Sequence, residues 1–162
     1  MKKHLFIFIG IFISLATTRL IPHPPNFTSL LALSFYVPAL LGIRYLPHLI
    51  ISFAITDLII GYHFATHWTW GSVLIIGFLP VIFSEKIFSR IIGALTGALI
   101  FYLISNFGVW SNGSYGYSWE GLIKCFVLAI PFFAYSLIST LIFSIIIEIF
   151  YSLLKTKVKK YI

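Results

Sequence analysis

The sequence predicts an all-α integral membrane protein with six transmembrane helices, and three observations support this fold class. First, 60% of the 162 residues are hydrophobic and 9% are charged, whereas soluble domains carry about a quarter charged residues. Second, the apolar residues form stretches of roughly the length that crosses a bilayer. Third, the basic residues gather at the ends of these stretches. We expect one membrane domain over residues 1–162, with no room for a folded soluble domain.

The first predicted span covers residues 4–21 and follows two lysines. Its apolar part of roughly a dozen residues also fits the core of a signal peptide, and Ser14-Leu15-Ala16 is similar to a cleavage site. Cleavage would leave five spans and would break the charge asymmetry described below, so we favour a retained helix. The other spans are expected at residues 27–43, 46–62, 68–84, 87–107 and 121–153.

Proline, asparagine and glycine residues indicate how several spans begin, bend and pack. Asn26 stands where it would cap the second span, and Pro38 is expected to kink that span. Pro47 fits the first turn of the third span. In the fifth span, Gly93 and Gly97 follow the four-residue spacing that lets another helix approach closely.

The sixth stretch, residues 121–153, is longer than the hydrocarbon core requires at about 1.5 Å per helical residue. We expect it to tilt, to kink at Pro131 or to project from the membrane.

The basic residues indicate an orientation. With the amino terminus in the cytoplasm, nine of the 11 lysines and arginines fall on the cytoplasmic side and only Arg19 and Lys124 fall on the other. The positive-inside rule therefore predicts both termini in the cytoplasm. The nine are Lys2, Lys3, Arg44, Lys86, Arg90, Lys155, Lys157, Lys159 and Lys160.

The same reasoning accounts for the other charges near that side. The net charge of +7 is explained by topology and lipid contact, so we expect no nucleic-acid partner. Glu85 and Glu148 fall near cytoplasmic ends, where solvated carboxylates and ion pairs are expected.

The remaining unusual residues then gather on the outer side, although they come from distant parts of the chain. The stretch from Arg19 to Phe27 holds three prolines in four positions, which cannot continue a helix and make a rigid polar link. We predict that this link forms part of an outward-facing ligand site. The predicted ligand-binding residues are Arg19, His23, Asn26, Asp57, His63, Asn106, Trp110 and Trp119.

Asp57 is the strongest single signal for that site. A carboxylate inside an apolar helix costs about 2.5 to 3.5 kcal/mol on insertion scales unless it finds a partner. The candidates are Arg19, a histidine, or a cationic group on a ligand. A purely structural pair with Arg19 is one reading, and a pair that also shapes a pocket is the other.

All four tryptophans fall on the outer side under this orientation. An interfacial aromatic belt is the ordinary explanation, but a belt should occupy both interfaces. Trp110 and Trp119 flank the flexible Ser111–Ser114 turn and are our candidates for flat walls around a flat ligand. The belt and the binding wall remain alternatives.

Metal, thiol and catalytic sites have weaker support. His63 and His67 would share a face if they lay on one helix, so they are weak candidates for a metal. Cys125 is the single cysteine and lies in an apolar stretch, so we interpret it as a packing residue. The sequence holds no nucleophile elbow, paired carboxylates or phosphate loop. We therefore predict a protein that is not an enzyme and that uses no cofactor.

Several motifs together resemble an uncharacterised bacterial family of small six-span membrane proteins. The resemblance covers nearly the whole chain and implies a multi-pass protein of the bacterial cytoplasmic membrane. It rests on Arg19-x-x-Pro22-His23-Pro24-Pro25-Asn26-Phe27, Asp57 with Gly61-Tyr62-His63, Ser105-Asn106-Phe107-Gly108-Val109-Trp110, Tyr117, Gly121-Leu122 and Ala129-Ile130-Pro131-Phe132-Phe133.

The six-span architecture in turn resembles the substrate-capture (S) subunits of energy-coupling factor transporters. That resemblance implies a pocket for a vitamin or cofactor precursor near the outer surface, with a separate transmembrane coupling subunit and ATPases as partners. The first span lacks the Ala-x-x-x-Ala pattern by which S subunits dock the coupling subunit. Similar size and span count in the shape-determining membrane protein D of rod-shaped bacteria keep a second function open, a scaffold or assembly factor that binds a partner protein.

Overall fold

The computed structural model describes residues 2–83 and 85–160, and within these residues it is built from helices without strands. The helices are connected by short turns, as the apolar stretches predict. They are α1 (Lys2–Leu20), α2 (Leu30–Leu41), η1 (Ile43–Tyr45), α3 (Leu46–Ile60), α4 (Thr66–Phe78), η2 (Leu79–Val81), α5 (Ile87–Ser111), α6 (Trp119–Leu128) and α7 (Ile130–Lys160), with η marking 3-10 helices.

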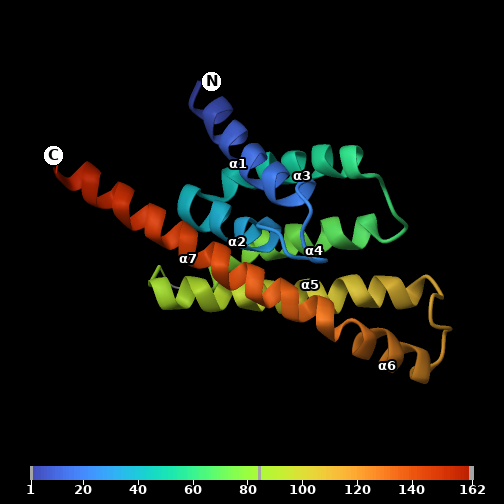
Figure 1. Ribbon diagram of the computed structural model, residues 1–162. Helices are drawn as coiled ribbons and strands as arrows, with labels where there is room; N and C mark the ends of the chain where they lie inside the picture. The colour runs from blue at the N-terminus through green and yellow to red at the C-terminus, as the bar shows by residue number, and fades with distance from the viewer. Residues whose placement is uncertain (1, 84, 161–162) are drawn as a thin grey trace.

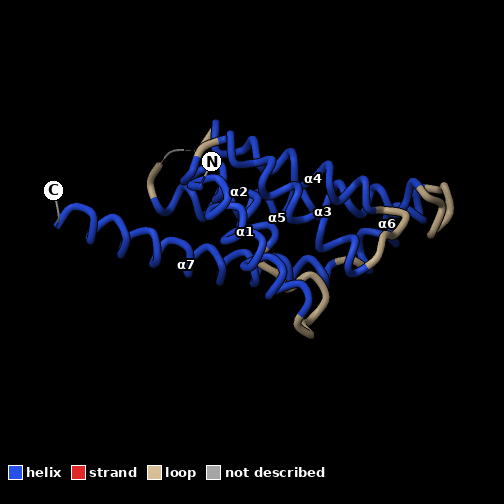
Figure 2. Tube along the Cα trace, turned by 90° about the horizontal axis from the view of Figure 1, so that it is seen from above, coloured by secondary structure: helices blue, strands red, loops and turns tan. Residues whose placement is uncertain are grey.

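Helix α2 lies at the centre of the bundle (Figure 1). It packs against α4, α5 and α7, while α1 pairs chiefly with α3 and α6 packs on α5 and α7. Both termini lie toward one end of the bundle together with η1, which we call the terminal end (Figures 1 and 2). The connections over residues 61–65 and 112–118 lie at the opposite end, which we call the loop end.

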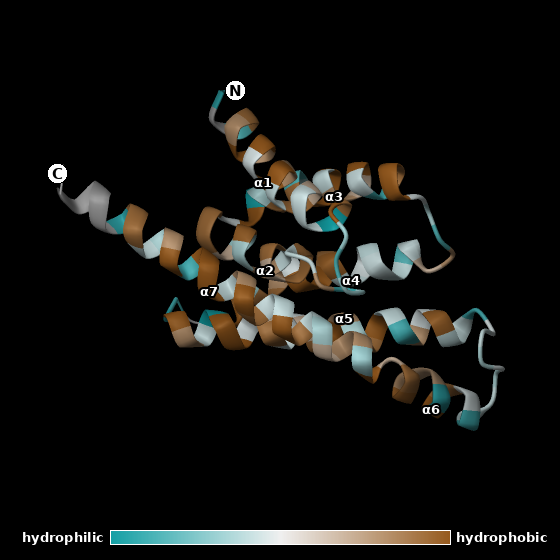
Figure 3. Cartoon of the chain, in the orientation of Figure 1, coloured by the Kyte–Doolittle hydropathy of each residue, from teal (hydrophilic) through white to brown (hydrophobic). Residues whose placement is uncertain are grey.

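Three helical stretches are long and apolar enough to cross a membrane: Ile43–Ile60, Ile87–Ser111 and Ile130–Lys155. Two shorter apolar helices, His4–Leu20 and Leu30–Leu41, accompany them. Large hydrophobic side chains are exposed along most helices, and apolar residues dominate the bundle in Figure 3. An exposed apolar surface of this extent suits a lipid environment and not water. The structure therefore supports a helical membrane protein.

The sixth predicted stretch is not one helix. Helix α6 ends at Leu128 and α7 begins at Ile130, so the break falls at Ala129, two residues before Pro131. Proline lacks the N–H that would continue the helical ladder and disfavours helical backbone in the residue before it. A disruption near Pro131, one of the three expected outcomes, is observed, and α7 with its 31 residues is still longer than the hydrocarbon core requires.

The predicted cap of the second span is wrong. Helix α2 begins at Leu30, with Ser29 at its N-cap position, and Asn26 lies outside it. Pro38 lies inside α2, and its carbonyl accepts a hydrogen bond from the Gly42 N–H (3.0 Å) where the helix ends. The chain then continues through η1 into α3.

The two glycines of α5 allow close helix contacts, as their spacing predicts. A β-carbon at Gly93 would lie 2.4 Å from the Phe35 ring of α2, and one at Gly97 would lie 2.9 Å from Ile76 of α4. Both distances are shorter than van der Waals contact. The absence of side chains at these positions therefore sets how closely α5 approaches the core helices α2 and α4.

We predict that Gly93→Val lowers the free energy of unfolding by about 1–3 kcal/mol, because the added carbons overpack the contact with Phe35. The measurement is thermal unfolding in detergent with a thiol-reactive dye, since Cys125 is only 2% exposed in the fold. Gly10→Val is the matched control, because no atom lies within 4 Å of a β-carbon at Gly10. Equal melting temperatures for the two variants would contradict this account of the packing.

Candidate functional site

The link between α1 and α2 is a tight turn over Pro24–Phe27. The Phe27 N–H donates to the Pro24 carbonyl (3.0 Å), and Asn26 has a positive φ of 62°. Proline in the second position and asparagine at positive φ in the third are typical of a type II turn. His23 donates from Nδ1 to the same Pro24 carbonyl (2.7 Å). The rigidity expected of this link is thus produced by a turn that needs Asn26 in the left-handed region.

Asp57 of α3 and Arg19 of α1 form an ion pair. Arg19 Nη2 lies 2.6 Å from Asp57 Oδ1, and Arg19 Nη1 donates to the hydroxyl of Thr56. The second carboxylate oxygen, Oδ2, accepts from the indole Nε1 of Trp70 in α4 (2.6 Å). The Arg19 guanidinium also stacks over the Phe53 ring at 4.6 Å from its centroid. Three helices therefore meet at one carboxylate.

The burial of this pair explains why so many groups converge on it. Asp57 is 6% exposed, and the side chain of Arg19 is 15% exposed. A charge with little access to water needs both a counter-ion and hydrogen bonds to its remaining polar atoms. Each Asp57 oxygen has a charged or indole donor, so the carboxylate is compensated without a bound cation. The pair holds α1 to α3 and forms one wall of a cavity.

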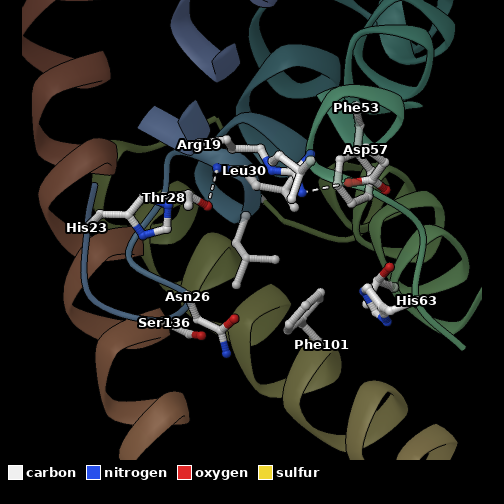
Figure 4. A pocket seen from close by; sticks show the side chains of 13 residues that line it. Arg19, His23, Asn26, Thr28, Leu30, Phe53, Asp57, His63, Phe101 and Ser136 are labelled. Carbon is white, nitrogen blue, oxygen red and sulfur yellow. Dashed lines mark hydrogen bonds and ion pairs between the residues drawn. The ribbon is translucent and has the colours of Figure 1, made fainter. Parts of the chain in front are cut away.

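The cavity has a volume of about 250 Å³ and contains both partners of the ion pair. Figure 4 shows Arg19 and Asp57 on one side and Asn26, Phe101 and Ser136 on the other. The wall combines charged and polar side chains with apolar ones. Its residues are Arg19, His23, Asn26, Thr28, Leu30, Leu31, Phe53, Asp57, Ile60, His63, Thr69, Phe101 and Ser136.

A second cavity of about 250 Å³ adjoins the first and is lined mainly by α5 and α7. The two share Asn26, His63, Thr69, Phe101 and Ser136, and Asn106 lines the second one. Asn106 donates from Nδ2 to the Tyr102 carbonyl of its own helix (2.7 Å), which leaves its side-chain oxygen available. The five predicted residues Arg19, His23, Asn26, Asp57 and His63 thus share one cavity, and Asn106 lies next to it.

The two tryptophans do not line either cavity. Trp110 donates from Nε1 to the Ser118 carbonyl (3.3 Å) and packs against Phe107 and Tyr117 in the α5–α6 connection. Trp119 is 70% exposed at the start of α6. The aromatic ring between the two cavities is instead Phe101. The flat walls expected from Trp110 and Trp119 are therefore absent from this site.

The histidines do not form a metal site among the described residues. His63 lies in the connection before α4 and His67 lies within α4, so they do not share a helix face. His63 accepts from the Ala65 N–H at Nδ1 (3.2 Å), and no group of three potential ligands occurs in the described part of the chain. Cys125 is buried, as the packing interpretation expects, with its thiol 3.3 Å from the Asn106 carbonyl.

Sequence reasoning missed several residues that complete the site. Trp70 and Thr56 bind the ion pair, and Phe101 and Ser136 line both cavities. Trp70 carries a signal in the sequence, because an intramembrane carboxylate needs donors and an indole is a donor only. Phe101 and Ser136 carry none, since their types are common in apolar helices.

A second buried ion pair lies toward the terminal end and corrects the interpretation of Glu148. Glu148 of α7 is 5% exposed and so is not at a solvated helix end. It accepts from Arg90 of α5 in two bonds, from Nε at 2.7 Å and from Nη2 at 2.6 Å. Arg90 also donates to the Glu85 carbonyl. The ion pair expected near this end exists, but inside the bundle.

Comparison with known proteins identifies a family. The model of a family of unknown function, DUF6580, matches residues 1–161. The chain belongs to this family. No curated protein and no solved structure matches the chain. The DUF6580 match agrees with the resemblance to an uncharacterised family, and its extent shows that both cavities and both ion pairs lie within the family's domain.

We predict that Asp57→Ala lowers the free energy of unfolding of this DUF6580 protein by about 3–5 kcal/mol, because it leaves Arg19 buried without a counter-ion. Thermal unfolding in detergent measures the loss. Glu120→Ala is the control, since Glu120 is an exposed carboxylate in the first turn of α6. A loss at Asp57 no larger than that at Glu120 would show that the pair does not stabilise the bundle.

Proposed function

We propose that this protein is a six-span binding subunit of the bacterial cytoplasmic membrane that captures a small, flat solute for uptake. The observation that carries the proposal is the cavity that Arg19, Asp57, Asn26, His23 and His63 share, although they come from α1, the α1–α2 link, α3 and the α3–α4 connection. Concave sites that combine an apolar wall with a few convergent polar groups are typical of small-molecule binding.

The distribution of basic residues supports an outward-facing cavity. Lys2, Arg44, Lys86 and Lys155 lie on segments at the terminal end. The cavity is lined by Ile60 and His63, which lie where α3 passes into the connection at the loop end. The positive-inside rule then assigns the terminal end, with both termini, to the cytoplasm. The side chains of Lys3, Lys157, Lys159 and Lys160 lie outside the described residues.

The size and chemistry of the cavity narrow the solute. Engineered cavities of about 150 Å³ hold benzene, so a volume of about 250 Å³ fits a single substituted ring. Asp57 and Thr56 use two of the five N–H donors of Arg19, and Pro24 uses Nδ1 of His23. Further Arg19 donors, His23 Nε2 and the Asn26 amide then bind the polar edge of the ring, and Phe101 packs against its face.

Uptake of this kind also needs a source of energy. The sequence holds no ATP-binding motif, so coupling through ATP requires partner proteins. In the S-subunit analogy these are a transmembrane coupling subunit and ATPases. Helix α1 offers only Gly10 and Ala16 as small aliphatic residues, so the coupling subunit would use a different contact from the usual one.

A scaffold or assembly factor is the second candidate function. The observation that favours it is the pair of exposed aromatic side chains at the loop end, Tyr117 (75% exposed) and Trp119 (70% exposed). Exposed aromatic groups of this kind are enriched at protein interfaces. In this alternative the outer face binds a partner protein and the cavity holds no solute.

The proposed function predicts that a vitamin or vitamin precursor stabilises the purified protein in a thermal-shift screen. A solute at 100 times its Kd raises the free energy of unfolding by about 2.7 kcal/mol. Asn26→Gly should abolish this shift, because glycine keeps the positive φ of the turn and removes only the side chain. Trp119→Ala is the control and should keep the shift, since Trp119 lies outside the cavity.

Two results would overturn the solute proposal in favour of the scaffold. One is the absence of a stabilising solute in a broad screen, combined with recovery of a stoichiometric membrane partner in pull-downs. The other is a shift that survives Asn26→Gly and is lost in Trp119→Ala, because binding would then depend on the exposed aromatic surface.

A further inference from the structure

A wide apolar groove runs along the surface of the bundle between α1 and α7. Helix α1 pairs chiefly with α3, and α7 packs on α5 and α2, so α1 and α7 stand on either side of α2 (Figure 1). The groove has a volume of about 700 Å³, and most of the residues that line it are apolar. Its walls include Gly10 and Ile13 of α1 and Phe143 and Phe150 of α7, and its floor includes Val37 of α2.

The length of the groove matches one leaflet of a bilayer. On α7 it extends from Phe143 to Leu154, which at about 1.5 Å per residue is a length of about 16 Å. The hydrocarbon core is about 30 Å thick, so each leaflet contributes about 15 Å. Leu41 and Leu154 lie at the terminal end of the groove, and Thr17 lies at its other end. The groove therefore suits acyl chains of a single leaflet that enter from the terminal end.

The cross-section of the groove favours hydrocarbon chains over a helix. A volume of about 700 Å³ spread over a length of about 16 Å gives a cross-section of about 45 Å². An α-helix with its side chains is about 10–12 Å wide and has a cross-section of about 80–110 Å². A helix would therefore stand largely outside the groove, whereas extended chains lie within it. The wall at Gly10 leaves this space open, because no atom lies within 4 Å of a β-carbon there.

A more polar cavity adjoins the groove at the terminal end. It has a volume of about 350 Å³ and shares Leu40 and Tyr151 with the groove. Arg90 and Glu85 also line it. The Arg90 guanidinium lies 5.5 Å from the centroid of the Tyr151 ring, and the Lys155 ammonium lies 5.9 Å from the same centroid. The apolar groove thus opens at one end into a space bordered by cationic groups.

The charges around this opening favour an anionic group. The Arg90 guanidinium is already neutralised by its ion pair with α7. Lys155, Lys86 and Arg44 are exposed at the same end and form no ion pair with a described residue. Glu85 is the exposed carboxylate on this side, so the balance is positive. Basic groups at the cytoplasmic ends of membrane helices are typical binding sites for anionic lipid head groups.

We propose that the groove and the adjoining cavity together bind one phospholipid with an anionic head group. Its acyl chains lie in the groove along α1, α2 and α7, and its phosphate lies at the opening beside Tyr151, where Lys155 binds it. The chains then bridge α1 and α7, which make little direct contact. The lipid therefore completes the packing of α1, and its binding does not depend on a solute in the outer cavity.

The test is native mass spectrometry of the full chain in detergent after removal of co-purified lipid. Dioleoyl phosphatidylglycerol or dioleoyl phosphatidylcholine is added at equal concentration, so that the two lipids share their chains and differ in net charge. We expect one phosphatidylglycerol per protein, with an occupancy about fivefold that of phosphatidylcholine. Phosphatidylglycerol should also raise the melting temperature more than phosphatidylcholine does, because it stabilises the contact between α1 and α7.

Two variants separate the chain site from the head-group site. Gly10→Phe should abolish binding of both lipids, because its ring fills the groove. Gly71→Phe is the matched control, since a β-carbon there also has no atom within 4 Å and Gly71 lies outside the groove. Lys155→Gln should lower phosphatidylglycerol binding to the level of phosphatidylcholine. Lys124→Gln, an exposed lysine of α6, should leave that preference unchanged.

Melting temperatures without added lipid verify that each variant folds. Equal occupancy by the two lipids in the wild-type protein would overturn the proposal, as would unchanged phosphatidylglycerol binding in Gly10→Phe. A bound second copy of the chain in place of lipid, lost in Gly10→Phe, would also overturn it, because the groove would then hold a helix.

Discussion

The arrangement of this bundle depends on one constraint: a charge buried among apolar helices must find its partners inside the protein. Asp57 satisfies it with Arg19 from α1 and Trp70 from α4, so a single carboxylate holds three helices together. The cavity at the loop end follows from this contact, because Arg19 and Asp57 form one of its walls. Structure and candidate function therefore share the same residues.

The same constraint operates toward the terminal end, where Glu148 of α7 binds Arg90 of α5 in a two-bond contact. The two pairs differ in what surrounds them. Asp57 accepts from donors on two different helices and adjoins a cavity, whereas both oxygens of Glu148 accept from the guanidinium of Arg90.

The sequence predicted the chemistry of the site better than its boundaries. Asp57 was identifiable because a carboxylate in an apolar helix demands compensation, and Arg19 was the nearest arginine on the same side. Asn26 was misread as a cap, since the Pro-Pro-Asn order also encodes a type II turn and local sequence does not choose between them. Trp110 and Trp119 were predicted to line the site because of their residue type and their position around a turn. The directions of their side chains depend on how the α5–α6 connection folds, which the sequence does not show.

Glu148 shows the other limit of sequence reasoning. Glu148 lies near the end of a long apolar stretch, where a solvated carboxylate is expected. Only the packing of α5 against α7 brings Arg90 beside it. Gly93 and Gly97, by contrast, were predictable, because small residues at this spacing have one principal use in membrane helices.

The central claim is that an aqueous recess at the loop end opens away from the cytoplasm. Single cysteines at Thr28, which lines the cavity, and at Glu85, in the exposed turn before α5, test it in a Cys125→Ala background. A membrane-impermeant maleimide should label Thr28→Cys in intact cells and Glu85→Cys only after the membrane is opened. The reverse pattern, or a Thr28→Cys that no reagent reaches from either side, would contradict the account.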